Sequence, residues 1–519
     1  MIVAFRVDSS AEIGSGHVMR CLALAEALKP HGADVTFVCR RHDGDLVDVI
    51  RARGFDVEVL APPSSDRDPA WGMLGVPWEQ DARDTLDVLP AETAWLVVDH
   101  YALDAAWESR MRDRVPRILV MDDLADRRHD CDALLDPTYP GEAGRYRGLV
   151  PPDARLLLGP RYAQMAAPYA EAAGRTAGDR GEGPRLLVFY GGTDVHDLTG
   201  RTLRAITGEG LRDVPAEVVL GATNPHRQHV EALARERRGT TVHAPQPALA
   251  DLMAACSLAA SAGGVTLWER LCVGLPGVVV SLAENQVASC TALAEAGLTT
   301  YLGGIDQASE AAIAGALQAL LDDPEQAAST AERGQAIVDG LGARRVAEVM
   351  LPTPARALTV RLAGAADRGR YFGWANDPTV RRSALTTRDI AWDEHRAWFA
   401  ARLADGGCHL LVLEADGLPV GQARFDLVDG VATLDYSIDA AVRGRGWGVV
   451  LLGLAIADLR ASGRFDIVAD VRSDNAASVA TLMHAGFRPT SDSGAEVLRL
   501  RLQGGDDGVA HDADLVIGQ

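Results

Sequence analysis

Short apolar runs alternate with helix-like segments from the first residue to about residue 350. Runs that are apolar throughout are typical of strands buried on both faces of a parallel sheet. The helix-like segments between them supply the crossovers that parallel strands require. The pattern therefore predicts a doubly wound α/β fold. The runs are Val3–Val7, Val35–Cys39, Trp95–Val98, Ile118–Met121, Leu186–Tyr190, Glu217–Leu220, Leu258–Ser261 and Val278–Ser281.

This alternation is interrupted around residues 150–184, where Pro151-Pro152 and a segment rich in Gly and Arg break the pattern. Clusters of Pro and Gly mark domain boundaries or exposed loops. We therefore expect an N-terminal lobe over residues 1–150 and a C-terminal lobe over residues 151–350. Two α/β lobes in tandem predict a ligand cleft between them.

A third unit is expected over residues 357–503, after a Pro-containing linker at residues 351–356. It should begin with helix and continue as a sheet. The last segment, residues 504–519, has four Asp and no Arg or Lys, which is typical of a flexible tail. The expected strands are His409–Glu414, Val420–Asp426, Val431–Ile438 and Ile467–Val471.

Composition excludes several classes of protein. The 519 residues include 51 basic and 72 acidic side chains, a net charge of −21 that argues against nucleic acid as the main partner. No apolar stretch is long enough to span a membrane, and the N-terminus lacks the pattern of a signal peptide. The seven cysteines form no CxxC pair, so we expect a reduced, cytoplasmic enzyme without structural zinc. The oligomeric state stays open.

The first candidate site is a Gly-rich loop that ends in a histidine. Strand Val3–Val7 leads through Gly14 and Gly16 to His17, and a helix follows as far as Leu28. A strand, a Gly-rich turn and a helix present backbone N–H groups to an anion. The positive end of the helix dipole disfavours the imidazolium form, so His17 is a candidate general base. The alternative is a helix-start residue that only packs against its neighbours.

Two similar loops occur in the second lobe. Leu186–Tyr190 ends in Gly191-Gly192-Thr193-Asp194, and Leu258–Ser261 leads into Gly263-Gly264. Small residues between a strand and a helix are the contacts that a nucleotide diphosphate requires. Glu269, about one turn into the following helix, is placed to accept hydrogen bonds from ribose hydroxyls. The alternative is that both loops are tight turns required only for packing.

Four acidic residues lie near expected strand ends in the first lobe. They fit either a metal site or a structural role in capping helices and pairing with arginine, and we favour the structural interpretation. The four residues are Asp99, Asp122, Asp123 and Asp132.

The first 350 residues resemble a known family. The similar segments are Arg6-Val7-Asp8, Ile13–Cys21, Leu24-Ala25, Val98–Tyr101, Met121–Arg127, Cys131-Asp132, Gly263–Arg270 and Glu284-Asn285-Gln286. Together they resemble the UDP-sugar hydrolases of pseudaminic acid biosynthesis, which are themselves similar to the two-lobed GT-B glycosyltransferases.

This resemblance implies metal-independent hydrolysis of UDP-2,4-diacetamido-2,4,6-trideoxy-β-L-altropyranose, with water attacking the anomeric carbon. His17 matches the family's proposed catalytic base. The residues expected to bind substrate are Asp8, Gly14, Gly16, Gly192, Gly263, Gly264, Thr266, Glu269, Asn285 and Gln286.

The third unit contains a second Gly-rich loop, between strand Val431–Ile438 and a helical run over Val449–Arg460. The loop resembles the R/QxxGxG/A pattern of the GNAT N-acetyltransferases, whose backbone N–H groups hold the pyrophosphate of CoA. The resemblance implies acetyl-CoA as co-substrate. The residues expected to bind it are Arg443, Gly444, Arg445, Gly446, Gly448, Asn475 and Ser478.

The beginning of this unit, from Trp374–Pro378 to Trp398-Phe399, is similar to the nucleotide-sugar N-acetyltransferase of the same pathway. Many GNAT enzymes place a tyrosine after the Gly-Phe element as the acid that protonates the thiolate. Here no tyrosine follows Gly486-Phe487, so the general acid stays open. Tyr436 is either a packing residue of its strand or that acid.

The sequence thus predicts a bifunctional enzyme that N-acetylates a UDP-4-amino sugar and then removes UDP. One alternative is the same pair of reactions on a different diamino sugar of another nonulosonic acid pathway. Another is a GT-B glycosyltransferase fused to an acetyltransferase, since a fold does not fix a function. A last one leaves the acetyltransferase unit as an inactive CoA-binding module.

Overall fold

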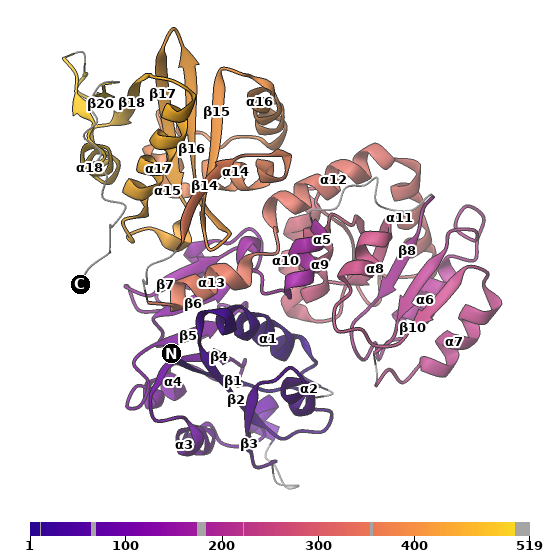
Figure 1. The fold of residues 1–519 in the computed structure, drawn as a ribbon. Coiled ribbons are helices and arrows are strands. Elements are labelled where there is room, and N and C mark those ends of the chain that lie inside the picture. The colour runs from indigo at the N-terminus through magenta and orange to yellow at the C-terminus, as the bar shows by residue number, and fades with distance from the viewer. Residues whose placement is uncertain are drawn as a thin grey trace. The chain divides into compact units, whose positions relative to one another are not determined.

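The computed structural model describes residues 1–10, 12–63, 69–173, 183–221, 223–352, 357–491 and 493–503. The chain divides into two compact units, Met1–Ala347 and Glu348–Gln519, each of which is shown as a ribbon in Figure 1. Most of the predicted linker and the whole predicted tail, residues 504–519, lie outside the described residues. Among the helices that the structure describes, none has the length and apolar character to cross a membrane.

The first unit contains two parallel sheets. The N-terminal sheet has seven strands in the order β3-β2-β1-β4-β5-β6-β7. Its last strand lies beyond the predicted lobe boundary at residue 150 but pairs with β6, so the first sheet extends past that boundary. The strands are β1 (Ile2–Val7), β2 (Asp34–Arg40), β3 (Asp56–Leu60), β4 (Thr93–Asp99), β5 (Ile118–Met121), β6 (Ala133–Asp136) and β7 (Arg155–Leu158).

The second sheet has six parallel strands in the order β10-β9-β8-β11-β12-β13. Alternate residues of its strands enter different cores: Leu187 and Ala259 belong to one apolar cluster, and Val188 and Ala260 to another. Helices therefore cover both faces, as a doubly wound fold requires. The strands are β8 (Leu186–Phe189), β9 (Ala216–Val219), β10 (Thr240–His243), β11 (Leu258–Ala262), β12 (Gly277–Ser281) and β13 (Thr300–Gly304).

The helices of the first unit connect these strands (Figure 1). The predicted helix after the Gly-His loop is confirmed, since α1 runs from Gly16 to Leu28. The α-helices are α1 (Gly16–Leu28), α2 (Val47–Ala52), α3 (Trp78–Val88), α4 (Ala105–Met111), α5 (Ala167–Ala173), α6 (Leu198–Ala205), α7 (Arg227–Glu236), α8 (Ala250–Ala255), α9 (Val265–Val273), α10 (Glu284–Glu295), α11 (Glu310–Asp322) and α12 (Pro324–Ile337). The next helix, α13 (Gly342–Met350), begins in the first unit and ends in the second.

The second unit is built on a mixed sheet in the order β14-β15-β16-β17-β18-β20-β19. The expected helical start is wrong, because β14 precedes the first helix and pairs antiparallel with β15. The strands are β14 (Leu358–Leu362), β15 (Cys408–Ala415), β16 (Leu418–Val428), β17 (Val431–Ile438), β18 (Asp466–Arg472), β19 (Arg488–Pro489) and β20 (Val497–Leu502). The helices are α14 (Arg368–Ala375), α15 (Pro378–Ser383), α16 (Trp392–Ala404), α17 (Trp447–Ser462) and α18 (Ala476–His484).

Strand β17 is paired very differently on its two sides. It pairs with β16 from Val431 to Ile438, along its whole length. It pairs with β18, in parallel, only through the three residues Val431–Thr433. The two strands therefore separate after Thr433, which opens the sheet next to the start of α17.

Candidate functional sites

A cavity of about 380 Å³ lies within the first unit, lined by residues of both lobes. The predicted ligand cleft between the lobes is therefore present. Its walls carry His17 and Arg20 of α1, together with Gly263 and Gly264, which precede α9. Further lining residues are Glu12, Gly16, Tyr101, Asp123, Gln164, Trp268, Asn285, Gln286 and Ser289.

His17 is held at the edge of this cavity by Asp99, the last residue of β4. The imidazole Nδ1 lies 2.6 Å from Asp99 Oδ1, and the histidine is only 9% exposed. Because the carboxylate can only accept, Nδ1–H must donate to it. In the neutral imidazole, Nε2 then carries no proton and can accept one.

Arg20, one helical turn after His17, fixes the same carboxylate. Its Nε donates to Asp99 Oδ2 and its Nη2 to Asp99 Oδ1, both within 2.6 Å. Burial alone would raise the pKa of Asp99, but the adjacent charge of Arg20 and the hydrogen bonds from Arg20 and His17 hold it well below its usual value. Asp99 therefore stays ionised and orients the histidine without taking its proton.

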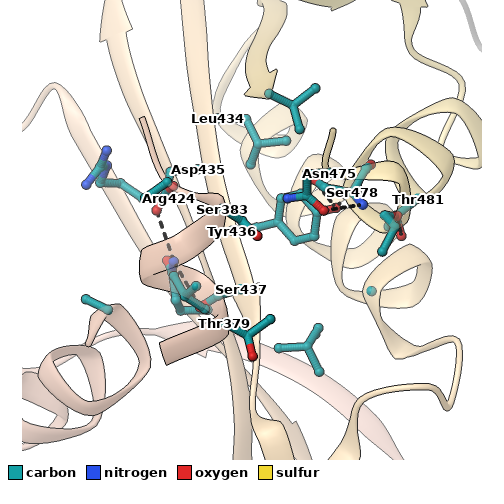
Figure 2. A pocket seen from close by; sticks show the side chains of 18 of the residues that line it. Thr379, Ser383, Arg424, Leu434, Asp435, Tyr436, Ser437, Asn475, Ser478 and Thr481 are labelled. Atoms are coloured by element: carbon teal, nitrogen blue, oxygen red, sulfur yellow. Dashed lines mark hydrogen bonds between the residues drawn. The ribbon is translucent and has the colours of Figure 1, made fainter. Parts of the chain in front are cut away.

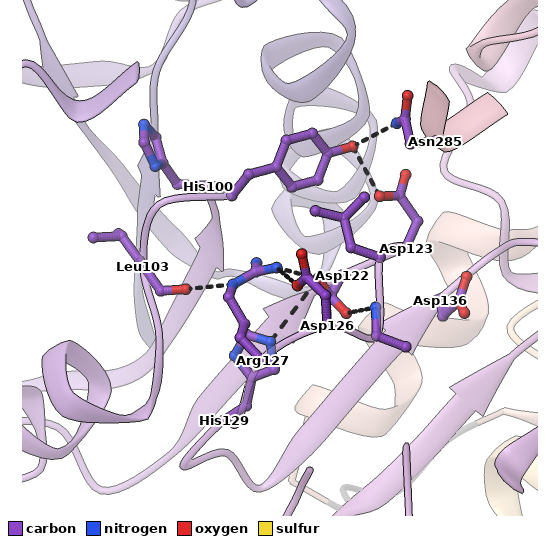
Figure 3. A network of polar contacts seen from close by, with 12 residues as sticks. His100, Leu103, Asp122, Asp123, Asp126, Arg127, His129, Asp136 and Asn285 are labelled. Atoms are coloured by element: carbon purple, nitrogen blue, oxygen red, sulfur yellow. Dashed lines mark hydrogen bonds and ion pairs between the residues drawn. The ribbon is translucent and has the colours of Figure 1, made fainter. Parts of the chain in front are cut away.

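Tyr101 connects this pair to the second lobe. Its ring meets the His17 ring edge-on, with centroids 4.6 Å apart. Its hydroxyl donates to Asp123 Oδ1 at 2.8 Å and accepts from Asn285 Nδ2 at 3.1 Å. Figure 3 labels these two partners, Asp123 and Asn285. Asn285, predicted to bind substrate, is thus in contact with the first lobe and lines the cavity.

The loop that carries Asp123 is braced by its neighbour Asp122. Arg127 pairs with Asp122 at 2.8 Å and also donates to the carbonyl of Leu103 (Figure 3). The backbone N–H of Ala125 donates to the same carboxylate at 2.8 Å. These contacts fix the segment from which Asp123 reaches Tyr101.

The expectation that the four acidic residues pair with arginine is confirmed. Asp99 pairs with Arg20, Asp122 with Arg127, Asp123 with Arg20, and Asp132 with Arg112 at 2.6 Å. Within the part of the chain that the structure describes, no group of three or more His, Cys, Asp or Glu side chains is arranged to hold a metal ion.

Close packing explains one of the predicted glycines, Gly263. A Cβ on Gly16 would lie 3.7 Å from Val265 Cγ2, an ordinary van der Waals contact, so this loop of the first lobe packs against the start of α9 but has room for a small side chain. A Cβ on Gly263 would lie 2.5 Å from Cys290 Sγ, which leaves no room for a side chain. Gly264 and Gln286 also line the cavity.

Five predicted substrate-binding residues do not line the cavity: Asp8, Gly14, Gly192, Thr266 and Glu269. Asp8 is fully buried, where it pairs with Arg6 at 2.6 Å and accepts the backbone N–H of Arg40. Its carboxylate is therefore engaged in a structural network. Gly192 lies near the Gly-rich loop of the first lobe, since a Cβ on Gly192 would be 3.8 Å from Ser15 Oγ.

Glu269 faces Tyr169 in the interior of the second lobe. Burial raises the pKa of Glu269 to about 7, and a hydrogen bond from Tyr169 opposes this shift. The carboxyl group is therefore only partly ionised near neutral pH.

Sequence reasoning missed several residues of this cavity. The roles of Arg20 and Tyr101 depend on contacts between segments far apart in the sequence, although both belong to the quoted motifs. No motif or residue spacing in the sequence indicated Gln164 as a cavity residue. It is 4% exposed, its Nε2 donates to the carbonyl of Tyr162, and its buried Oε1 has no hydrogen-bond partner among the described residues.

A second cavity, of about 920 Å³, lies within the second unit. It is lined by the start of α17, by α18 and by strands β16 to β18, and Figure 2 shows part of its wall. The predicted cofactor residues Arg443, Gly444, Gly446, Gly448, Asn475 and Ser478 all line it. Arg445 does not; its guanidinium pairs with Glu348 at 3.4 Å.

The Gly-rich loop leaves open space in front of α17. Gly444 and Gly446 have φ values of 84° and 75°, in the left-handed region that glycine tolerates best, and a Cβ on either would meet no atom within 4 Å. Arg443 braces the loop by donating to the carbonyl of Ile438 and by pairing with Asp377 at 2.9 Å. The loop thus presents the N-terminus of α17 to an anion without obstruction.

Tyr436 contacts the start of α18. Its hydroxyl lies 2.9 Å from Ser478 Oγ, and Asn475 caps the helix by accepting the N–H of Ser478 (Figure 2). Burial raises the pKa of Tyr436, so the phenol stays protonated at neutral pH. Tyr371, which also lines the cavity, donates its hydroxyl to the carbonyl of Leu411. Tyr436 is therefore the better placed of these two phenols to give up a proton.

The first unit has a known relative of similar length. The UDP-2,4-diacetamido-2,4,6-trideoxy-beta-L-altropyranose hydrolase of Campylobacter jejuni is 23% identical over 299 residues, which cover 57% of this chain and 97% of the relative. The resemblance to that hydrolase family is confirmed. Among solved structures, MurG of Acinetobacter baumannii is similar with a TM-score of 0.47 and 13% identity, covering 67% of this chain and 98% of MurG.

The second unit matches the family model described as Acetyltransferase (GNAT) domain, over residues 357–488. The L-methionine sulfoximine/L-methionine sulfone acetyltransferase of Salmonella typhimurium is 31% identical over 141 residues, which cover 26% of this chain and 82% of the relative. The predictions of an enzyme and of acetyl-CoA as co-substrate are confirmed by this family match. Through residues 357–488 the chain belongs to the GNAT acetyltransferase family.

Proposed function

We propose that this chain catalyses two successive reactions on one nucleotide sugar. The first is transfer of an acetyl group from acetyl-CoA to the 4-amino group of UDP-4-amino-4,6-dideoxy-N-acetyl-β-L-altrosamine. The second is hydrolysis of the resulting UDP-2,4-diacetamido-2,4,6-trideoxy-β-L-altropyranose to free sugar and UDP. The observation that carries the proposal is the His17–Asp99 pair at the edge of a cavity shared by the two lobes.

In the hydrolytic step, Nε2 of His17 takes a proton from a water molecule as its oxygen attacks the anomeric carbon. The new bond forms while the bond from the anomeric carbon to the phosphate oxygen breaks, and UDP leaves with the electron pair. The backbone N–H groups at the start of α9, next to Gly263 and Gly264, would stabilise the charge on the diphosphate. Asp99 keeps Nδ1 protonated throughout, so that Nε2 remains the base.

In the acetyl transfer, the open backbone of Gly444 and Gly446 would hold the CoA pyrophosphate at the start of α17. The neutral amine attacks the thioester carbonyl, a carbon–nitrogen bond forms and the carbon–sulfur bond breaks. The nitrogen then gives its extra proton to solvent water. CoA leaves as a thiolate, which takes a proton from the hydroxyl of Tyr436. Ser478 Oγ, 2.9 Å away, supports that hydroxyl.

A second candidate for the acetyl acceptor is a small amino-acid derivative. It is favoured by the 31% identity of this domain to the Salmonella acetyltransferase, whose name gives L-methionine sulfoximine and L-methionine sulfone. In that case the two units would act on unrelated substrates.

Mass spectrometry on the full chain separates these possibilities. A synthetic UDP-4-amino sugar is incubated in heavy-oxygen water, with and without acetyl-CoA, and L-methionine sulfone is tested in parallel. The proposal expects acetylation of the nucleotide sugar, followed by unlabelled UDP and a free sugar that carries the heavy oxygen. UDP release only after addition of a glycan or protein acceptor would instead favour a glycosyltransferase.

A further inference from the structure

One wall of the second cavity is formed by the chain that follows α14. The lining residues of this stretch lie between Asp377 and Ile390, and we call residues 377–390 the wall segment. It contains the short helix α15, and Figure 2 labels two of its residues, Thr379 and Ser383. Its lining residues include Thr379, Val380, Arg381, Ser383, Leu385 and Ile390.

Asn376, directly before the wall segment, closes this segment into a loop. Its Oδ1 accepts the backbone N–H of Ile390 at 2.8 Å, and its Nδ2 donates to the carbonyl of Ile390 at 3.0 Å. Within the loop, the guanidinium of Arg381 donates to the carbonyls of Thr386 and Arg388. Compact loops whose ends are close are held together by such local contacts. The wall segment therefore forms one piece of structure.

Asp377 connects the wall segment to the Gly-rich loop before α17. Its Oδ1 accepts the backbone N–H groups of Thr379 at 2.9 Å and of Val380 at 3.1 Å, which caps α15. The same oxygen lies 2.9 Å from Arg443 Nη2, and the side chain of Asp377 is only 11% exposed. Hydrogen bonds between charged groups are stronger than neutral ones, and burial reduces their screening by salt. A single carboxylate therefore holds the wall segment to the loop.

Arg443 lies between this carboxylate and the proposed place of the CoA pyrophosphate. Its Nε donates to the carbonyl of Ile438, the last residue of β17, at 3.0 Å. Neither this contact nor the contact with Asp377 uses Nη1, and the side chain of Arg443 lines the cavity. Nη1 can therefore donate to an anion at the start of α17. An anion bound there would fix the guanidinium and, through it, Asp377.

Trp374 makes a second contact with the same loop. Its Nε1 donates to Asp439 Oδ2 at 2.8 Å, and both residues are buried. The other oxygen of Asp439 accepts the backbone N–H of Ala441 at 2.9 Å. The loop is thus held near its start by Trp374 and, further along, by Asp377. These contacts give the Trp, Asn and Asp of the sequence motif that begins this unit a common structural role.

We infer that Asp377 is a positioning residue for acetyl transfer, which couples the wall segment to the loop that holds the CoA pyrophosphate. When CoA binds, its pyrophosphate fixes Arg443, Arg443 fixes Asp377, and the wall segment becomes ordered with them. One wall of the cavity is therefore set in place by the cofactor. This inference rests on the acetyl transfer of the proposed function and adds a residue that contacts neither reactant.

Hydrogen–deuterium exchange on the full chain, with and without saturating CoA, tests this coupling without an acceptor. In the wild type, the backbone amides of the wall segment should exchange at least about fivefold more slowly when CoA is bound. Asp377→Asn keeps an oxygen that caps α15 but loses the charge that pairs with Arg443, so this slowing should disappear. Asp470→Asn is the matched control, because Asp470 lines the same cavity and pairs with Arg499 at 2.7 Å. This variant should keep the slowing.

Kinetics and calorimetry separate positioning from a structural role. The amine is whichever of the UDP-4-amino sugar and L-methionine sulfone the wild type acetylates. Asp377→Asn should raise the KM for this amine about tenfold, because the wall is no longer fixed when CoA is bound. The affinity for CoA should stay within about threefold of wild type, since backbone N–H groups hold the pyrophosphate. Adding Arg443→Gln to Asp377→Asn should raise the KM for the amine no further than the more severe single change, because both remove the same contact.

Equal slowing of exchange in the wild type and in Asp377→Asn would overturn the inference. A loss of CoA affinity as large as the rise in the KM for the amine would also overturn it, because Asp377 would then only stabilise the loop. So would an effect of Asp377→Ala that Asp377→Asn does not share, because the carboxylate would then act only as a helix cap. If the wild type acetylates neither amine, the proposed acetyl transfer is wrong, and the exchange experiment alone decides whether the coupling exists.

Discussion

Asp99 Oδ1 lies 2.6 Å from His17 Nδ1, although the two residues are 82 positions apart in the sequence. The same oxygen also accepts a hydrogen bond from Arg20 Nη2. Because the guanidinium holds Asp99 in its charged form, the carboxylate is a weak base. It serves to orient the imidazole and to fix which of its nitrogens carries the proton.

Replacement of His17 by Asn should lower hydrolytic turnover by about 10²–10⁴-fold, the usual range for loss of a general base. Acetyl transfer should be unaffected, because the residues proposed for it belong to the other unit. UDP release and CoA release, measured separately on the same preparation, test both statements. Hydrolysis at the wild-type rate would remove His17 from the mechanism.

Asp99→Asn should reduce hydrolysis by about 10–10³-fold with little change in KM. The amide can donate to Nδ1, which would move the proton to Nε2 and block the base. Asp132→Asn is a suitable control, because Asp132 is also paired with an arginine but does not line the cavity. Equal activities of the two variants would show that the His17–Asp99 contact is only structural.

Gly446→Val should abolish acetyl transfer and spare hydrolysis. Valine is strained at φ 75°, and its side chain would enter the open space in front of α17 where we propose that the pyrophosphate binds. Gly453→Val, within α17 itself and also facing open space, controls for the introduction of valine next to this loop. An unchanged KM for acetyl-CoA in Gly446→Val would exclude this loop from the cofactor site.

Tyr436→Phe should lower kcat for acetyl transfer by about 10²-fold and leave the KM for acetyl-CoA nearly unchanged, because only the proton donor is lost. Ser478→Ala, which removes the partner of the phenol, should have a smaller effect of the same kind. Steady-state kinetics with a thiol reagent reports both constants. A Tyr436→Phe variant with normal kcat would show that Tyr436 is not the proton donor and only packs in its strand.

Glu269→Gln should change how stability depends on pH. The folded protein has a Glu269 pKa of about 7 against an ordinary 4.5, so it holds an extra proton between these values and loses stability as pH rises through this window. Glutamine does not titrate, so the variant should gain up to about 3 kcal/mol relative to wild type between pH 4 and 8. Thermal unfolding across that range measures the difference.

The exposed Glu325→Gln on α12 should show no such trend. UDP affinity measured on Glu269→Gln reports in addition whether the carboxylate contacts the ribose. A pH profile identical to that of wild type would mean that the Glu269 side chain is solvated and has the usual pKa of a glutamate.

Much of the sheet architecture could be predicted because central strands are buried and therefore apolar. Ile118–Met121 and Val431–Ile438 were predicted with the bounds that the structure has. The missed β10 has the sequence Thr-Thr-Val-His and lies at a sheet edge, where a strand is half exposed and has no apolar run. β14, also at an edge, was missed for the same reason.

The candidate sites were predictable only where the chemistry is local in sequence. Gly-rich loops that precede a helix carry their own signal, and His17 and Gly446 both line cavities. The sequence indicated Asp99 as an acidic residue at a strand end. Its contact with His17 could not be predicted, because that contact forms only when the chain folds. The buried oxygen of Gln164 has no hydrogen-bond partner among the described residues, a property of burial that no spacing of residues reveals.

The early separation of β17 from β18 has a consequence for how the acetyltransferase unit can evolve. The gap after Thr433 exposes main-chain groups at the edge of β17, which every residue possesses, whereas the faces of the strand are chemically defined by side chains such as Asp435 and Ser437. An extended ligand that pairs with an open strand edge is recognised largely without regard to sequence. Because such pairing does not depend on side chains, we expect substitutions on the faces of β17 to change the polar lining of the cavity while the unpaired edge of the strand is retained.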